Sequence, residues 1–429
     1  MNQLPTDERI SLPRDQIDRL TSNLILRTDS YKFSHWKMYD ELKTVYSYFE
    51  SRAGAAYPET VFCGLQPILT KMSGSVITQM DIEEADAFCK DHFMMDGMFN
   101  RKMWQYIVDE HKGKLPLRIK AIPEGTPVNI GNVLLTVENT DPKCASLTNH
   151  FETWLTHIWY SSTVATLSRS VKIMIKQFLD RTSESDASID FMLHDFGYRG
   201  VSSVESAGYG TLGHLVNFKG TDTVEGILYA RKYYSEPMAG FSVPASEHSV
   251  MTSKGREGEY EVIANLIKIY PTGILSLVLD SFNIYNACEH LGTVLKDAVL
   301  AREGKVVVRP DSGHPPEVTM KIIVILEKHF GVTVNEKGYK VLPPKIGIIY
   351  GDGLDVAMIK LILETLEKSK WAASNLVFGM GGGLLQKVNR DTQRNAFKCS
   401  ANETMDGEWH DIFKDPIDGS KKSKAGKYT

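Results

Sequence analysis

A run of glycines near the end of the chain is the first feature that suggests chemistry. The stretch FGMGGGLLQK (378–387) has four glycines in five positions at the end of an apolar run. Such density lets the backbone come very close to a neighbouring group, because no Cβ intervenes. Leu384 stands where a dinucleotide fingerprint needs its third glycine, and Lys387 lacks the flanking residues of a P-loop. The run resembles a phosphate loop of another kind.

Ionisable residues follow a series of strand-like runs in the same half of the chain. In a βα barrel the chemistry lies at the C-terminal ends of the strands. The residues at those positions are His194, Asp195, Phe196, Arg199, Lys219, Asp222, Glu247, His248, Asp280, Arg309, Asp311 and Asp352. Arginines suit phosphate oxygens, and carboxylates suit magnesium or sugar hydroxyls. With the turns GDG (351–353) and GMGGG (379–383), these residues predict a phosphorylated sugar with a metal-bound diphosphate.

Simpler explanations exist for each of these residues taken alone. Asp195, Asp280 and Asp352 could be helix N-caps, and His194 could be a buried histidine with satisfied hydrogen bonds. Seven consecutive strand ends that all carry ionisable groups are harder to explain in this way. A zinc hydrolase is disfavoured because the sequence has no H-x-H or H-E-x-x-H motif.

The elements that must position these residues are repeated βα units. The predicted strands are 191–195, 215–218, 241–244, 274–280, 305–311, 345–352 and 375–381, and the predicted helices include 223–234, 282–301, 316–330 and 354–370. Apolar strands about thirty residues apart are typical of parallel strands buried on both faces. Seven such units favour an α/β fold with a closed or nearly closed βα barrel, and an open doubly wound sheet is the alternative.

The rest of the chain reads differently. Residues 1–160 predict a mixed α+β domain, with a helix after Asp29 and an antiparallel sheet within 117–137. The barrel domain is expected at 161–387. Strands are expected to stop there, and the basic segment 388–429 reads as a solvated terminus when taken alone.

Composition limits the possible partners and the compartment. The 429 residues carry a net charge of −4, with 42% hydrophobic and 24% charged residues, which is ordinary for a globular enzyme and gives no reason to expect nucleic acid or a membrane surface. Five scattered cysteines without a C-x-x-C pair favour a reducing compartment. The N-terminus is too polar for a signal peptide, and no apolar run approaches a membrane span. We therefore expect a cytoplasmic protein.

Several long motifs resemble those of the nicotinamide phosphoribosyltransferase family, within the type II phosphoribosyltransferases. They are TDSYK (28–32), HDFGYRGVSS (194–203), VNFKGTDT (216–223), SVPASEHS (242–249), DSFNIYNACE (280–289), RPDSG (309–313), GDG, the glycine run and FKCS (397–400). The resemblance extends from about residue 24 to 427. It implies an irregular βα barrel, a homodimer with active sites at the interface, and a basic segment 388–429 that returns toward the N-terminal domain and the dimer partner. The implied reaction joins nicotinamide to phosphoribosyl diphosphate.

The resemblance also implies roles for residues around the pyridine ring. Phe196 would stack on the ring, with Tyr31 of a second subunit on the other face. Asp222 would accept a hydrogen bond from the carboxamide, and Arg199 would lie near the ring and phosphate. A carboxylate at 222 suits an amide donor and repels the carboxylate of nicotinate, which favours the amide substrate.

Other residues would bind phosphoribosyl diphosphate. By resemblance, Arg309 and Asp311 hold the ribose and its phosphate, and Asp280 lies toward the magnesium. The remaining substrate-binding residues implied are Gly351, Asp352, Gly381, Gly382, Asp29 and Arg52, with Arg390, Lys398 and Lys421 from the partner subunit. Magnesium would be held mainly through the diphosphate, so no side chain is assigned as a metal ligand. ATP would be a co-substrate that phosphorylates His248, and Glu247 could orient that ring.

The sequence departs from the family in three places, and rival functions remain. Ala396 replaces a serine that would contact the diphosphate, Lys427 replaces an arginine, and the C-terminus is shorter than expected.

The nearest rival is a nicotinate phosphoribosyltransferase. A sugar-phosphate barrel lyase would need a Schiff-base lysine, for which Lys219 is the candidate, and a non-catalytic protein that kept the fold is a third possibility.

Overall fold

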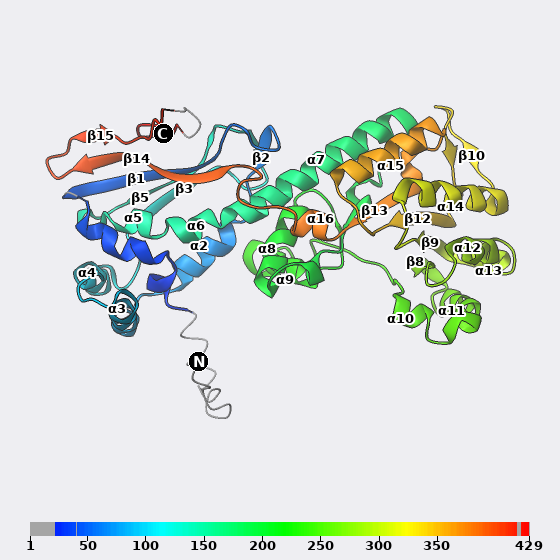
Figure 1. The fold of residues 1–429 in the computed structure, drawn as a ribbon, viewed down its shortest axis with the longest axis horizontal. Coiled ribbons are helices and arrows are strands. Elements are labelled where there is room, and N and C mark those ends of the chain that lie inside the picture. Colours follow the sequence, from blue (N-terminus) through cyan, green and yellow to red (C-terminus); the bar gives the residue numbers. More distant parts are fainter. Residues whose placement is uncertain (1–21, 40, 418–421, 429) are drawn as a thin grey trace, which may run out of the picture. The chain divides into compact units, whose positions relative to one another are not determined.

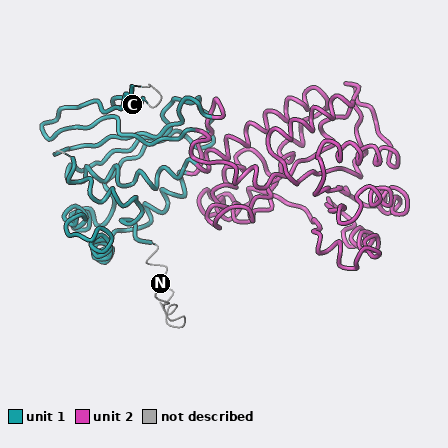
Figure 2. The backbone as a smooth tube through the Cα atoms, viewed as in Figure 1, with its two compact units in different colours: residues 1–55, 65–159, 394–429 teal, residues 56–64, 160–393 magenta. Residues whose placement is uncertain are grey.

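The protein forms two compact units, which are described separately here (Figure 2). The computed structural model describes residues 22–39, 41–417 and 422–428. Unit 1 comprises residues 1–55, 65–159 and 394–429, and unit 2 comprises residues 56–64 and 160–393. The short segment 56–64 thus belongs to unit 2, although the residues on both sides of it belong to unit 1. The sequence did not indicate this assignment. None of the helices in the described ranges combines the length and apolar character needed to cross a membrane.

Unit 1 contains a five-stranded antiparallel sheet in the order β15-β14-β1-β5-β3 (Figure 1). Its strands are β1 (Leu42–Ser51), β3 (Leu117–Ala121), β5 (Val133–Asn139), β14 (Asn395–Thr404) and β15 (Trp409–Asp411). The predicted antiparallel pairing within 117–137 is confirmed, since β3 pairs with β5. The chain reverses between them with the help of Gly125 and Gly131, which have φ of 85° and 82°.

The prediction that strands stop after residue 387 is wrong. β14 pairs along its whole length with β1, and β15 follows it. The strand was hidden because buried polar side chains interrupt its apolar pattern. Ser51 donates to the side chain of Asn395 at 2.8 Å, and Ser400 donates to the Gly426 carbonyl at 2.8 Å. The segment 422–428 therefore packs on the unit 1 sheet, where Lys427 Nζ lies 2.9 Å from Glu138.

The helices of unit 1 range from three to 15 residues in length. They are η1 (Leu24–Leu26), η2 (Ser30–Lys37), α2 (Leu65–Gly74), α3 (Gln79–Phe93), α4 (Arg101–His111), η3 (Pro142–Cys144), α5 (Leu147–His150) and α6 (Glu152–Thr156), with the short strand β4 (Pro127–Asn129) between β3 and β5. The helix predicted after Asp29 is present as the 3-10 helix η2, with Asp29 at its N-cap position.

Unit 2 is built around six parallel strands in the order β7-β6-β13-β12-β9-β8. They are β6 (Leu193–Asp195), β7 (Gly220–Thr221), β8 (Thr272–Val278), β9 (Glu303–Arg309), β12 (Ile346–Tyr350) and β13 (Leu376–Met380). Five of the seven predicted strands are present. Residues 215–218 instead form the end of α8 and a turn, because Phe218 is buried there against the ring of His214.

The segment 241–246 closes the barrel, although it does not form the predicted strand at 241–244. Phe241 bridges Gly220 at one edge of the sheet, and Ala245 bridges Ser276 of β8 at the other. The backbone N–H of Phe241 donates to Lys219, and that of Ser246 donates to Ser276 at 2.9 Å. Pro244 has no N–H to donate, which limits this segment to single bridges. The predicted irregular βα barrel is confirmed, and the open sheet is not observed.

Helices connect successive strands and cover the barrel (Figure 1). They are α7 (Ile158–Thr182), η4 (Ile189–Phe191), η5 (Tyr198–Gly200), α8 (Val204–Leu215), α9 (Val224–Tyr234), α10 (His248–Met251), α11 (Gly255–Ile269), α12 (Ile284–Gly292), α13 (Lys296–Ala301), α14 (Pro315–Phe330), α15 (Val356–Lys368), η6 (Ala373–Asn375) and α16 (Gly382–Leu385); the remaining strands are β2 (Glu59–Val61), β10 (Thr333–Val334) and β11 (Lys340–Val341). The single helix predicted at 282–301 is two helices, because the chain turns after Gly292, which packs against His329.

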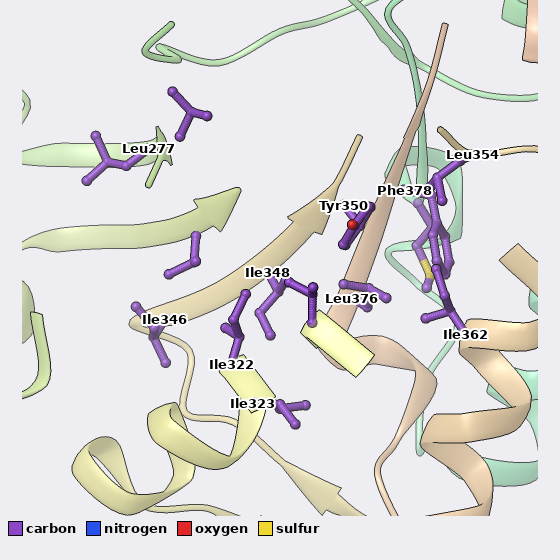
Figure 3. Packing of buried hydrophobic residues seen from close by; sticks show 14 of the residues in the cluster. Leu277, Ile322, Ile323, Ile346, Ile348, Tyr350, Leu354, Ile362, Leu376 and Phe378 are labelled. Carbon is purple, nitrogen blue, oxygen red and sulfur yellow. The ribbon is translucent and has the colours of Figure 1, made fainter. Parts of the chain in front are cut away.

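The apolar faces of strands and helices meet in one core (Figure 3). Ile346 and Ile348 of β12 pack with Ile322 and Ile323 of α14, all at most 2% exposed. This core fixes the strands whose C-terminal ends carry the polar residues.

The close approach of β8 and β9 at Gly304 can be tested by substitution. A Cβ added at Gly304 would lie 1.9 Å from the Gly273 carbonyl oxygen, so Gly304→Ala must displace backbone. We expect a loss of about 1–3 kcal/mol or more in the free energy of unfolding, measured by urea titration. Gly347→Ala is the control on β12, because its Cβ would meet only the flexible Lys305 side chain, at 3.1 Å. Equal stability of the two variants would contradict this packing.

Candidate active site

The C-terminal ends of the barrel strands bring together side chains that are far apart in sequence. Asp222 follows β7, and its Oδ1 accepts hydrogen bonds from His194 Nε2 at 2.9 Å and from Ser242 Oγ at 2.5 Å. A carboxylate can only accept, so the histidine nitrogen must be the donor. Three elements therefore hold one carboxylate: β6, the end of β7, and the closing segment 241–246.

These hydrogen bonds keep Asp222 charged. Burial by itself would raise the pKa of this carboxyl group, but the hydrogen bonds from His194 and Ser242 and the nearby charge of Arg309 lower it overall. The side chain is nevertheless 45% exposed. An anionic acceptor thus faces the open end of the barrel.

The glycines near Phe196 explain part of the run that opens the sequence analysis. A Cβ at Gly379 would lie 2.0 Å from Phe196 Cε2, and one at Gly351 would lie 2.9 Å from the same atom. A Cβ at Gly383 would lie 2.4 Å from the Leu354 carbonyl oxygen. Gly379 and Gly383 therefore serve close packing within the protein. Gly381 and Gly382 form the turn into α16, beside the Phe196 backbone and Gln386.

A second hydrogen-bonded group surrounds Asp280 at the end of β8. His248 Nε2 lies 3.0 Å from Asp280 Oδ1, and Asp280 Oδ2 accepts from the Asp311 N–H at 3.1 Å and from Ser312 Oγ at 2.5 Å. The expectation that Glu247 orients His248 is not supported, because Glu247 accepts from Ser249 instead. Asp280, 32 residues away, is the carboxylate that contacts the ring.

The carboxylate of Asp352 at the end of β12 is repelled by the carboxylates at the ends of β8 and β9. Burial raises the pKa of Asp352, and the charges of Asp311 and Asp280 raise it further. Such a group of like charges is unfavourable in an isolated protein and is relieved by a cation or a positively charged substrate.

Arg309 lies at the end of β9 with unused hydrogen-bonding capacity. Its Nη2 donates to the Ser246 carbonyl at 2.8 Å, whereas its buried Nε has no hydrogen-bond partner among the residues that the structure describes. A buried donor without a partner is unusual in a folded protein, and a role in binding or catalysis is one explanation for it.

The remaining predicted residues are not part of these groups. Asp195 is fully buried and accepts from Gly197 N–H, Thr211 and Thr221, so it is structural. Arg199 and Arg390 are exposed in unit 2. Four predicted residues lie in unit 1: Asp29, which accepts from Thr153; Tyr31, which is 55% exposed and edge-on to His35; Arg52; and Lys398 of β14. Lys421 lies outside the described residues.

A different cluster has metal-ligand residue types but is not a good metal site. His111, Asp141 and Cys144 approach one another in unit 1. Both oxygens of Asp141 are already used, by Tyr106 and His111 on one side and by the Lys143 N–H on the other. Burial raises the pKa of the Cys144 thiol to about 12, so it is neutral. We interpret the cluster as structural.

Comparison with known proteins agrees with the fold and identifies the family. The model of the nicotinate phosphoribosyltransferase (NAPRTase) family matches residues 191–429, and that of the nicotinamide phosphoribosyltransferase N-terminal domain matches residues 23–119. The chain is 46% identical over 413 residues to the nicotinamide phosphoribosyltransferase of Xanthomonas campestris pv. campestris, covering 95% of this chain and 87% of that protein. It is 34% identical to the Mycoplasma pneumoniae enzyme of the same name, covering 94% and 95%.

A solved structure supports the fold. Human nicotinic acid phosphoribosyltransferase superposes with a TM-score of 0.56 at 14% identity, covering 87% of this chain and 74% of that one. The architecture is thus that of a type II phosphoribosyltransferase. The chain belongs to the nicotinate phosphoribosyltransferase family, and its activity is that of a pentosyltransferase.

Some residues of the site were missed in the sequence. The hydroxyls of Ser242 and Ser312 donate to Asp222 and Asp280, and the backbone carbonyl of Ser246 accepts from Arg309. Each lies within a motif that the sequence singled out, but a serine beside an ionisable residue carries no distinctive signal of its own.

The repulsion at Asp352 predicts a pH-dependent stability change. Because folding raises its pKa, the carboxylate destabilises the protein above its folded-state pKa and has no effect below its ordinary value of 3.8. We expect Asp352→Asn to raise the apparent melting temperature at pH 8, and the gain to shrink as the pH falls toward 3.8. Asp311→Asn should show a gain in the same direction. An equal gain at pH 8 and pH 3.8, or none at pH 8, would contradict the assigned repulsion.

Proposed function

We propose that the protein is a nicotinamide phosphoribosyltransferase of NAD salvage. The pyridine nitrogen of nicotinamide would form a bond to C1 of phosphoribosyl diphosphate while the bond from C1 to the diphosphate oxygen breaks. The products are nicotinamide mononucleotide and diphosphate. The observation that carries the proposal is the anionic Asp222 carboxylate near the aromatic ring of Phe196, since His194 joins the two: its ring is 5.0 Å from that of Phe196.

Asp222 supports the amide over the acid as substrate. Its lowered pKa keeps it an acceptor, and an acceptor suits the N–H groups of a carboxamide. The carboxylate of nicotinate would bring a second negative charge to the same place, with no proton to share. The name of the Xanthomonas relative points the same way. Nicotinate is the alternative substrate, because the matched family is named for it.

The other polar residues suit phosphoribosyl diphosphate. In the transition state the ribose gains positive charge, and Asp311 and Asp352 would stabilise it electrostatically. Arg309, whose buried Nε has no partner among the described residues, would bind a substrate oxygen through its guanidinium group. The mutual repulsion of Asp280, Asp311 and Asp352 also fits a magnesium ion brought in with the diphosphate. Magnesium, when bound, would neutralise charge on the leaving diphosphate.

The second subunit and ATP complete the proposal. Tyr31, exposed on η2, would stack on the pyridine ring in the partner's site, and Arg390 and Lys398 would reach the partner's diphosphate. His248 would accept the γ-phosphoryl group of ATP, with release of ADP. Asp280 holds Nε2, so Nδ1 is the nitrogen left for that bond. Hydrolysis of the phosphohistidine would drive mononucleotide synthesis.

A comparison of the two candidate substrates tests the central role of Asp222. The protein is incubated with phosphoribosyl diphosphate, magnesium, and nicotinamide or nicotinic acid, and mononucleotide is measured. We expect product from the amide, and we expect Asp222→Asn to lower the ratio of kcat/KM for amide over acid by about tenfold or more, because a hydrogen bond to a charged group is lost. Product from the acid alone would contradict the amide proposal. Unchanged selectivity would show that Asp222 does not read the amide.

The role of His248 predicts a specific loss of ATP coupling. The His248→Ala variant should have the same rate with and without ATP, and should not take up an acid-labile label from γ-labelled ATP. Glu247→Gln is the matched control, because that carboxylate bonds to Ser249, and it should keep both labelling and stimulation. Full ATP stimulation in His248→Ala would rule out the phosphohistidine.

A further inference from the structure

The two donors to Asp222 both use the same oxygen. His194 Nε2 and Ser242 Oγ bind Oδ1, and Oδ2 accepts no hydrogen bond from the residues that the structure describes. With the side chain 45% exposed, Oδ2 is open to a ligand. A free carboxylate could rotate and offer either oxygen, whereas this one is held in a single orientation.

His194 itself is held on two sides. A Cβ at Gly220 would lie 2.7 Å from His194 Nδ1, so the ring lies against the backbone of β7. Its other neighbour is Phe196, with ring centroids 5.0 Å apart and planes at 46°. His194 and Phe196 are two residues apart, so they lie on the same face of the extended chain. Phe196, whose ring would stack on the pyridine, and His194, which donates to Asp222, are therefore positioned by the same short stretch of chain at β6.

Ser242 reaches Asp222 from a different element. It lies in the segment 241–246, which is held to β7 by the bonds between Phe241 and both Lys219 and Thr221. The Ser242 hydroxyl has an ionised acceptor at 2.5 Å, a charge-assisted geometry that is stronger than a bond between neutral groups. Barrel closure and the orientation of Asp222 thus depend on the same few residues.

We propose that His194 and Ser242 are positioning residues for substrate selectivity: by occupying Oδ1 of Asp222, they leave Oδ2 as the single acceptor for one carboxamide N–H. This inference rests on the proposed function. It adds that selectivity for the amide depends on the orientation of Asp222 as well as on its charge. Loss of either donor would let the carboxylate rotate, and the amide would lose more than a substrate without N–H groups.

The test is a double-mutant cycle with three substrates: nicotinamide, nicotinic acid and 3-acetylpyridine, which has the ring and carbonyl but no N–H. Ser242→Ala should lower the kcat/KM ratio of nicotinamide to 3-acetylpyridine by about 3- to 10-fold, the usual range for one hydrogen bond. The same change in an Asp222→Ala background should have no effect on that ratio, because Ser242 acts through Asp222. Ser170→Ala, which removes a hydroxyl bonded to the Leu167 carbonyl in α7, is the control.

His194→Gln provides a second variant, with thermal unfolding measured to confirm that it is folded, and it should shift the ratio in the same direction. The inference is overturned if the wild type is active on nicotinamide but Ser242→Ala keeps its selectivity, or if the effect persists without Asp222. A wild type that produces mononucleotide from nicotinic acid alone would instead overturn the proposed function, and this inference with it.

Discussion

Closure of the barrel by the segment 241–246 is the constraint on which the site depends. Single bridges from Phe241 to Gly220 and from Ala245 to Ser276 join the two edges of the sheet. The same six residues bring the Ser242 hydroxyl to Asp222 and the Ser246 carbonyl to Arg309. His248 follows two residues after the segment ends. A short segment with few backbone bonds of its own thus connects three parts of the site.

The site also concentrates charges that the fold does not neutralise. Asp352 remains under repulsion from Asp311 and Asp280, and the buried Nε of Arg309 has no partner in the described part of the chain. By contrast, Asp195 at the end of β6, which β13 separates from β12, has three donors and complete burial. Aspartates at different strand ends of the same barrel therefore differ in role according to whether the protein or a ligand satisfies them.

Much of the barrel could be predicted from the sequence because β8, β9, β12 and β13 are apolar runs with regular spacing. The segment 241–246 and the strand β14 were not correctly predicted, since Pro244 and the buried Asn395 and Ser400 break the usual patterns. The strand-end rule located Asp222, Asp280 and Asp352 together with the histidine partners His194 and His248, but not the serines that complete these groups. Which serine meets which carboxylate depends on contacts between elements, such as Ser242 with Asp222, which a linear pattern does not contain.

The claim that Asp222 reads the carboxamide is tested most directly by a crystal structure of the protein with nicotinamide mononucleotide. We predict that the amide nitrogen lies within about 3.2 Å of Asp222 Oδ2, while His194 and Ser242 stay on Oδ1. The pyridine ring should lie against Phe196. A carboxamide that turns its nitrogen away from Asp222, or a pyridine ring bound elsewhere in the barrel, would contradict the account.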